Sequence, residues 1–199
     1  MKYIKNVGFV FVLTIILSAC SNGGFHSDYQ YEIEDFEATN QRGEPINQND
    51  LKNGKVTLVD FIFTNCITVC PPMTYNMSQI QGMLEEEGVT DYQIVSFSVD
   101  PENDSPEVLS EYISNYEANE DNWHLVTGYK QEFISQLALN SFKTIVQNDP
   151  TSDQVIHGVN FYLVDQNGTV VKDYQGNEEV PMDMIVSDVK ALIKAGPVE

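Results

Sequence analysis

Apolar and polar positions alternate along the chain in a way that predicts strands and helices in turn. The run 56–63 is short, β-branched and aromatic, as expected of a buried strand. Apolar residues then recur at Met73, Met77, Ile80 and Leu84, which is the spacing of an amphipathic helix. Further strands are predicted at 92–99, 123–126, 142–146, 159–164 and 169–174, and further helices from about Ser105, Lys130 and Pro181.

This order of elements predicts the fold class. A short hairpin within 31–55 leads into the first central strand, a polar loop occupies 147–154, and Asn167-Gly168 suits the tight turn of a closing hairpin. A βαβ unit joined to a ββα unit gives an α/β, thioredoxin-like fold. We predict a central mixed sheet flanked by helices, with an N-terminal β-hairpin and an inserted segment, in one domain over 32–199.

Two thiols lie where the first central strand ends and the first helix begins. Cys66 and Cys70 follow the strand, and Pro71 and Pro72 suit a first helical turn, where a missing N–H has no intrahelical partner. Because a helix N-terminus favours negative charge, a thiolate here is predicted to have a lowered pKa.

The spacing of the two thiols differs from that of a thioredoxin dithiol, which has two residues between the cysteines rather than three. Residues four apart in a regular helix have Cβ atoms about 5–6 Å apart, further than the roughly 3.5–4.5 Å of a disulfide. A disulfide would therefore need Cys66 in a loop outside the helix, whereas one metal atom could bridge Cys66 and Cys70. A structural disulfide stays open as the alternative, because the N-terminus predicts export.

The first residues have the pattern of an export signal. A positively charged start precedes an apolar stretch at 7–17, which is too short to span a bilayer stably. The segment Leu-Ser-Ala-Cys at 17–20 resembles the bacterial lipobox, which implies cleavage before Cys20 and a diacylglyceryl group on its sulfur. We predict a lipoprotein signal peptide at 1–19, a lipid-anchored tether at 20–31 and a place on the outer face of the cell membrane. A plain signal peptide or a retained anchor helix is the alternative.

The charge of the chain excludes some partners. The whole sequence has 10 basic and 30 acidic residues and a formal net charge of −20. Removal of 1–19 takes away Lys2 and Lys5 but no acid. The remaining chain has 8 basic and 30 acidic residues, a charge of −22. Nucleic acids select basic surfaces, so they are not expected as partners. Anionic lipids are excluded for the same reason, and the membrane contact should be the lipid at Cys20 alone.

Three segments carry a resemblance to a known family. Residues 61–71 match the pattern aromatic-x-x-Thr-x-Cys-x3-Cys-Pro, 98–106 contain Ser-Val-Asp-Pro, and 156–168 run from a histidine into a strand. In these segments the chain resembles the Sco/SenC family of thioredoxin-fold copper proteins, which serve assembly of the CuA centre of cytochrome c oxidase. Many members carry an acid between the cysteines, where this chain has Ile67-Thr68-Val69, so any function of that acid is in doubt here.

The resemblance implies a site and a partner. By resemblance, Cys66, Cys70 and His157 are copper ligands, with one copper per chain as Cu(I) or Cu(II), and subunit II of the oxidase receives the metal. Two soft thiolates with one imidazole agree with that metal. Asp100 resembles a family acid and is given a supporting or transfer role, although it could equally cap a turn at Asp100-Pro101.

Other candidate ligands have plainer explanations. Met73 and Met77 share the apolar stripe of the first helix, so a core position is the stronger interpretation. His124, next to a tryptophan and a predicted strand, is expected to be structural.

Two functions are carried forward. The first is a copper metallochaperone that is not an enzyme, and the second is a thiol–disulfide reductase that keeps the CuA cysteines reduced, using Cys66 and Cys70 alone. A peroxiredoxin-like peroxidase is a weaker third option, because its Pro-x3-Thr-x2-Cys arrangement is absent around Cys66.

Overall fold

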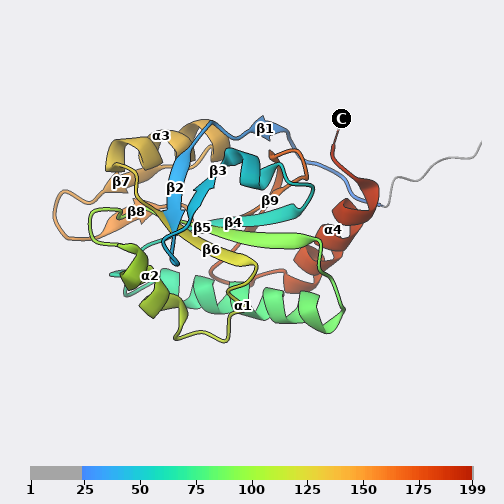
Figure 1. Cartoon of the computed structure of the whole chain (residues 1–199), viewed down its shortest axis with the longest axis horizontal. Coiled ribbons are helices and arrows are strands. Elements are labelled where there is room, and N and C mark those ends of the chain that lie inside the picture. The colour runs from blue at the N-terminus through green and yellow to red at the C-terminus, as the bar shows by residue number, and fades with distance from the viewer. Residues whose placement is uncertain (1–23, 199) are drawn as a thin grey trace, which may run out of the picture.

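A mixed β-sheet with helices on both faces forms the body of the protein (Figure 1). The structure is a computed structural model that describes residues 24–198. The main strands are β1 (Tyr31–Glu32), β2 (Glu37–Asn40), β3 (Pro45–Asn47), β4 (Val56–Ile62), β5 (Tyr92–Ser98), β6 (Trp123–Thr127), β9 (Asn160–Val164) and β10 (Thr169–Gln175). The helices are η1 (Gln48–Leu51), α1 (Cys70–Glu86), α2 (Pro106–Ile113), α3 (Gln131–Phe142) and α4 (Met182–Ala195), and β7 (Val146–Asn148) and β8 (Val155–His157) form a separate hairpin.

The sheet has the order β1-β10-β9-β4-β5-β6-β2-β3. Strands β4, β5 and β6 are parallel and joined by helices, whereas β9 runs antiparallel to β4 and β10 antiparallel to β9. Both central strands, β4 and β5, are buried along their whole length, because helices cover both faces of the sheet. The α/β class and the central mixed sheet are as the sequence predicts.

Two apolar clusters fill the space on the two faces of the sheet. Side chains of β4 alternate between them, with Val56, Leu58 and Ile62 in the cluster beneath α1 and α4, and Val59 and Phe61 in the cluster beneath α3. Figure 1 shows α1 and α4 on one side of the sheet and α3 on the other. The carboxyl ends of β4 and β5 point toward the end of the molecule where α1 begins and the β7–β8 hairpin lies.

One predicted strand is wrong, and two short strands that form a hairpin were missed. Residues 142–146 are not a strand: α3 continues to Phe142, and Lys143 then takes a left-handed conformation with φ of 55° that ends the helix. The polar loop predicted at 147–154 is in part the β7–β8 hairpin, in which Val146 pairs with His157. This hairpin carries the predicted histidine toward the thiols.

The start of the described chain lies against the domain. The Phe25 side chain packs on the cluster beneath α4, the backbone N–H groups of Asp28 and Tyr29 reach the Val171 carbonyl, and the Tyr29 hydroxyl donates to Asp173 at 2.5 Å. The part of the predicted tether that the structure describes, 24–31, is therefore packed along β10 and α4. The predicted signal peptide at 1–19 and Cys20 lie outside the described residues. Among helices of the described residues, none combines the length and apolarity that a membrane crossing needs.

Candidate metal and redox site

The structure brings together the three side chains that the sequence singles out as ligands. Cys70 is the first residue of α1, Cys66 lies in the turn after β4, and His157 ends β8. The Cys70 Sγ lies 3.5 Å from the His157 Nε2, and the Cys66 Sγ lies 3.3 Å from the Cys70 backbone N. Both thiols are free and buried.

The start of α1 sets the geometry of the thiol pair. Pro71 and Pro72 occupy the first turn, as predicted, and no side chain caps the helix, because the N-cap residue is Val69. The Cys66 sulfur takes the place of a cap, since it accepts the Cys70 N–H. Cys66 itself is outside the helix, so the i, i+4 distance that argued against a disulfide does not apply, and a disulfide between the two thiols needs only a local movement.

The two thiols have opposite acidities. Hydrogen bonds from the Cys70 thiol, the His157 side chain and the Cys70 N–H lower the pKa of Cys66, although burial opposes the shift. The pKa of Cys70 is raised by its hydrogen bond to Cys66, by burial and by the negative charge on Cys66. The lowered pKa predicted for a thiol at this helix start therefore holds for Cys66, which lies outside the helix, and not for Cys70, the first residue of the helix.

The imidazole of His157 is oriented by its own loop. Its Nδ1 lies 2.8 Å from the carbonyl oxygen of Gly158, which can only accept, so Nδ1 donates to that oxygen and the ring is held with Nε2 facing Cys70. The ring also meets Phe63 edge to face, with centroids 5.7 Å apart. Gly158 leaves no room for a side chain, since a Cβ atom there would lie 2.1 Å from the Thr144 Oγ1.

The donor set suits a soft metal ion. Two sulfurs and one imidazole nitrogen favour Cu(I) and also accept Cu(II). Across residues 24–198, no three His, Cys, Asp or Glu side chains already stand in the closed arrangement of a metal centre. Small side-chain movements would nevertheless form one, because Cys70 and His157 are already in contact and the Cys66 sulfur lies beside the same helix turn.

Asp104 supports the site and was missed by the sequence reasoning. It is fully buried and accepts hydrogen bonds from the Thr64 Oγ1 and the Ser98 Oγ, both at 2.5 Å, and from the Thr64 N–H. Burial raises its pKa, while these hydrogen bonds oppose the shift. It thereby ties the loop before Cys66 to the end of β5. The sequence signal was an acid directly before a helix start, but three acids lie between 100 and 104 and no pattern says which is buried.

Asp100 takes part in a turn rather than in the thiol site. Both of its carboxylate oxygens accept from the Asn103 Nδ2 at 2.9 Å, and its N–H donates to the Ser98 Oγ. It also lines a polar cavity of about 490 Å³ together with Asn65, the neighbour of Cys66. Within the described residues it has no hydrogen bond to either thiol or to His157, so the capping alternative describes its contacts.

A second buried acid, Asp60, lies in the middle of β4. Both carboxylate oxygens are buried without a hydrogen-bond partner among the described residues. Burial raises the pKa of Asp60 to about 6, although the Ser96 hydroxyl and His157 oppose the shift, and the charge on Asp60 contributes to the raised pKa of Cys70. The strand pattern gave no sign of this residue beyond one acid inside an apolar run.

The remaining candidates behave as the plainer interpretations predict. Met73 and Met77 are fully buried in the cluster beneath α1 and α4. The His124 Nδ1 lies 3.2 Å from the Arg42 guanidinium, and burial lowers its pKa. Ile67, between the two cysteines, is 84% exposed, so an apolar side chain faces solvent beside the thiols.

Comparison with known proteins gives one consistent relationship. A model of the SCO1/SenC family matches residues 26–194. The SCO1 protein homolog of Bacillus subtilis is 47% identical over 193 residues, covering 96% of this chain and 97% of that protein.

Solved structures agree with this relationship. A SCO1/SenC family lipoprotein from Bacillus anthracis superposes with a TM-score of 0.79 at 45% identity, over 84% of this chain and 99% of its own. BsSco, a member of the Sco family of cytochrome c oxidase assembly proteins in which a disulfide switch was identified, gives 0.77 at 48% identity, over 85% and 96%. Yeast Sco1 with copper bound gives 0.67 at 25% identity, over 80% and 89%. The thioredoxin-like fold predicted from the sequence is confirmed.

Proposed function

Because this chain belongs to the SCO1/SenC family, we propose that it is a copper-binding assembly factor for the CuA centre of cytochrome c oxidase. Copper is its cargo, held by Cys66, Cys70 and His157. The observation that carries the proposal is the convergence of three soft or borderline donors from separate elements, with the Cys70 sulfur 3.5 Å from the His157 Nε2. Copper bound to yeast Sco1 and the oxidase-assembly role stated for BsSco support it.

The residues at the site divide the work of binding. Cys66 offers the first ligand, because the hydrogen bonds that lower its pKa make it the thiol that loses its proton more readily. Cys70 must lose its proton when the metal arrives, so binding is accompanied by proton release. The Gly158 carbonyl holds the Nδ1–H of His157, so Nε2 is the ring nitrogen that can bind the metal.

The predicted partner is subunit II of the oxidase, and the predicted anchor is a lipid at Cys20 on the outer face of the cell membrane. The lipoprotein of Bacillus anthracis supports the anchor. The formal charge of −20 disfavours nucleic acid as a partner.

An anaerobic Cu(I) titration of the reduced, full-length protein tests the copper proposal. We expect one copper per chain, and His157→Ala should weaken binding by more than about 100-fold, since even outer partners of metal ligands contribute about 10- to 100-fold. His124→Ala is the matched control, because it removes an imidazole that contacts Arg42 rather than the thiols. Absence of copper binding by the reduced protein would defeat the proposal.

A thiol–disulfide reductase for the CuA cysteines is the second candidate. It is favoured by the position of Cys66 outside α1, by the lowered pKa of Cys66, and by the disulfide switch of BsSco. In this function Cys66 attacks the target disulfide, a mixed disulfide forms, and Cys70 then displaces the reduced target thiol while the chain itself becomes oxidised.

Oxidase maturation in cells separates the two candidates. A reductase needs Cys66 and Cys70 but not His157, whereas copper transfer needs all three. We expect His157→Ala to leave the CuA centre unfilled. Full maturation with His157→Ala, together with failure of Cys66→Ser, would replace the copper proposal with the reductase.

A further inference from the structure

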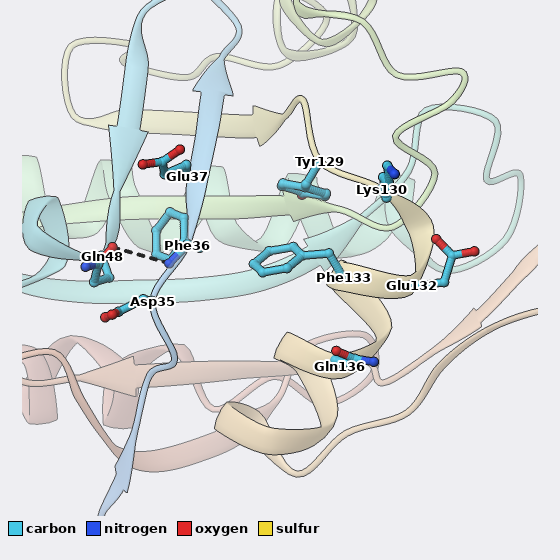
Figure 2. Close-up of a pocket in the computed structure, with 9 residues that line it drawn as sticks. All are labelled: Asp35, Phe36, Glu37, Gln48, Tyr129, Lys130, Glu132, Phe133 and Gln136. Carbon is cyan, nitrogen blue, oxygen red and sulfur yellow. Dashed lines mark hydrogen bonds between the residues drawn. The ribbon is translucent and has the colours of Figure 1, made fainter.

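A cavity of about 700 Å³ lies on the sheet face covered by α3, apart from the thiol site. It opens between the start of β2, the helix η1 and the first turn of α3, and it shares no lining residue with the thiol site (Figure 2). Its volume is within the range of about 300–1,000 Å³ that small-ligand sites occupy.

Aromatic rings form the apolar part of this cavity. Phe133, on α3, points toward Phe36, directly before β2, and Tyr129 lies beside Phe133 (Figure 2). The Phe36 ring is only 2% exposed and packs edge to face on Phe97, so it forms the floor of the cavity. The Tyr129 and Phe133 centroids are 5.7 Å apart at 43°, and the Tyr129 hydroxyl lies 2.8 Å from the carbonyl oxygens of Ser98 and Val126. Because that hydroxyl is already bound to the backbone, the ring is fixed in place.

Carboxylates dominate the rim. Asp35, Glu37 and Glu132 line the cavity with a single cation, Lys130, so the charged groups sum to −2. None of these four side chains has an ion pair or a side-chain hydrogen bond within residues 24–198, whereas elsewhere in the chain Lys172 pairs with Asp188 at 2.8 Å. The rim charge is therefore not neutralised by the protein itself.

We propose that this cavity is a binding site for an amphipathic cation, with its apolar body against Phe133 and Tyr129, over the floor formed by Phe36, and its positive group facing Asp35 and Glu37. Aromatic faces attract cations, and carboxylates without ion-pair partners add to that attraction. A free amine with an aromatic or alkyl body and a basic side chain of a bound peptide share this chemistry.

A titration of the isotope-labelled, full-length protein in non-ionic detergent, followed by NMR, tests the site. The probes are 2-phenylethylammonium and its neutral counterpart 2-phenylethanol, and in a second arm a short Leu-Arg-Phe peptide and its citrulline counterpart. We expect the cationic probe of at least one arm to shift the resonances of Phe36, Tyr129 and Phe133, with the neutral probe of that arm at least about threefold weaker.

Charge variants on the rim give the sharpest test. Asp35→Asn combined with Glu37→Gln should weaken the cation about threefold to tenfold, and Lys130→Gln should tighten it about threefold, since a like charge is removed. Glu111→Gln, an exposed acid on α2 away from the cavity, is the matched control and should change nothing. These side chains are exposed, so the variants are expected to fold.

The outcomes are decisive in both directions. Binding of the amine alone identifies a small-molecule site, and binding of the arginine peptide alone identifies a peptide site, and either supports the proposal. Equal binding of charged and neutral probes, insensitivity to the rim variants, or no shift with any probe overturns it.

Discussion

The buried carboxylate of Asp60 should make the protein less stable at neutral pH than an uncharged side chain would. Its two oxygens have no hydrogen-bond partner among the described residues, and burial raises its pKa from 3.8 to about 6. The groups near it are the Ser96 hydroxyl on β5, His157 on β8 and Cys70 on α1. We therefore expect Asp60→Asn to stabilise the metal-free, reduced protein relative to wild type as the pH rises.

The size and sign of the effect follow from the two pKa values. A pKa raised in the folded state means that the proton favours folding: its stabilisation is complete below pH 3.8 and is lost as the pH rises through about 6. The difference between 3.8 and about 6 corresponds to about 3 kcal/mol of unfolding free energy. The gain of the variant over wild type should thus grow by roughly 2 kcal/mol between about pH 4.5 and about pH 8.

Urea unfolding of wild type and Asp60→Asn across that pH range measures the difference directly. A constant penalty for an unpaired buried amide in the variant cancels, because only the change of the difference with pH matters. Glu111→Gln serves as the control, since it removes an exposed acid on α2 in place of the buried acid of β4. A difference for Asp60→Asn that is flat, or that falls as the pH rises, would refute the reasoning.

Three further predictions concern the thiol site. Gly158→Ala should weaken Cu(I) binding by about tenfold in a competition titration, because the alanine Cβ would lie 2.1 Å from the Thr144 Oγ1. Adding Thr144→Ala should restore most of the affinity. If the double variant binds no better, the clash with Thr144 is not the reason for the loss. Asp104→Ala should lower the unfolding free energy by about 3 kcal/mol in urea, since it leaves buried donors without an acceptor, and a loss below about 0.5 kcal/mol would contradict the anchoring role. Because its pKa is lowered, Cys66 should react with iodoacetamide at a pH well below the ordinary thiol pKa, whereas Cys70 should not. Mass spectrometry of the modified peptides measures the two rates. Equal rates would refute the difference in acidity between the two thiols.

Much of the fold could be predicted because its signals are local. The β-branched run of β4, the prolines that start α1 and the Ser105 N-cap of α2 each act within a few residues, and each is where the pattern placed it. The error at 142–146 arose because Phe142 and Val146 suit a strand by type, whereas the left-handed Lys143 ends a helix there. A lysine does not signal that conformation, which glycine or asparagine usually marks.

The candidate site could be predicted only in part. The cysteines stand out by spacing and position, but His157 was reached through family resemblance, because its three-residue strand directly follows a polar loop. Asp60 and Asp104 are buried by elements that lie far away in the sequence. The periodicity of their own segments gives no sign of that burial. The position of Cys66 outside α1 likewise depends on one turn of backbone between 66 and 70.

The packing of residues 24–31 along β10 and α4 restricts how the protein can meet a partner. If Cys20 carries a lipid as proposed, four residue steps join it to Gly24, a reach of at most about 14 Å. The described chain starts beside the end of α4, whereas α1 begins at the other end of the molecule (Figure 1). Since α1 has 17 residues and spans about 25 Å, a domain standing on its anchor would hold Cys66 and Cys70 away from the bilayer. An acceptor site close to the membrane could then be reached only if the domain tilts, so the length of the chain between 20 and 24 would limit the rate of transfer.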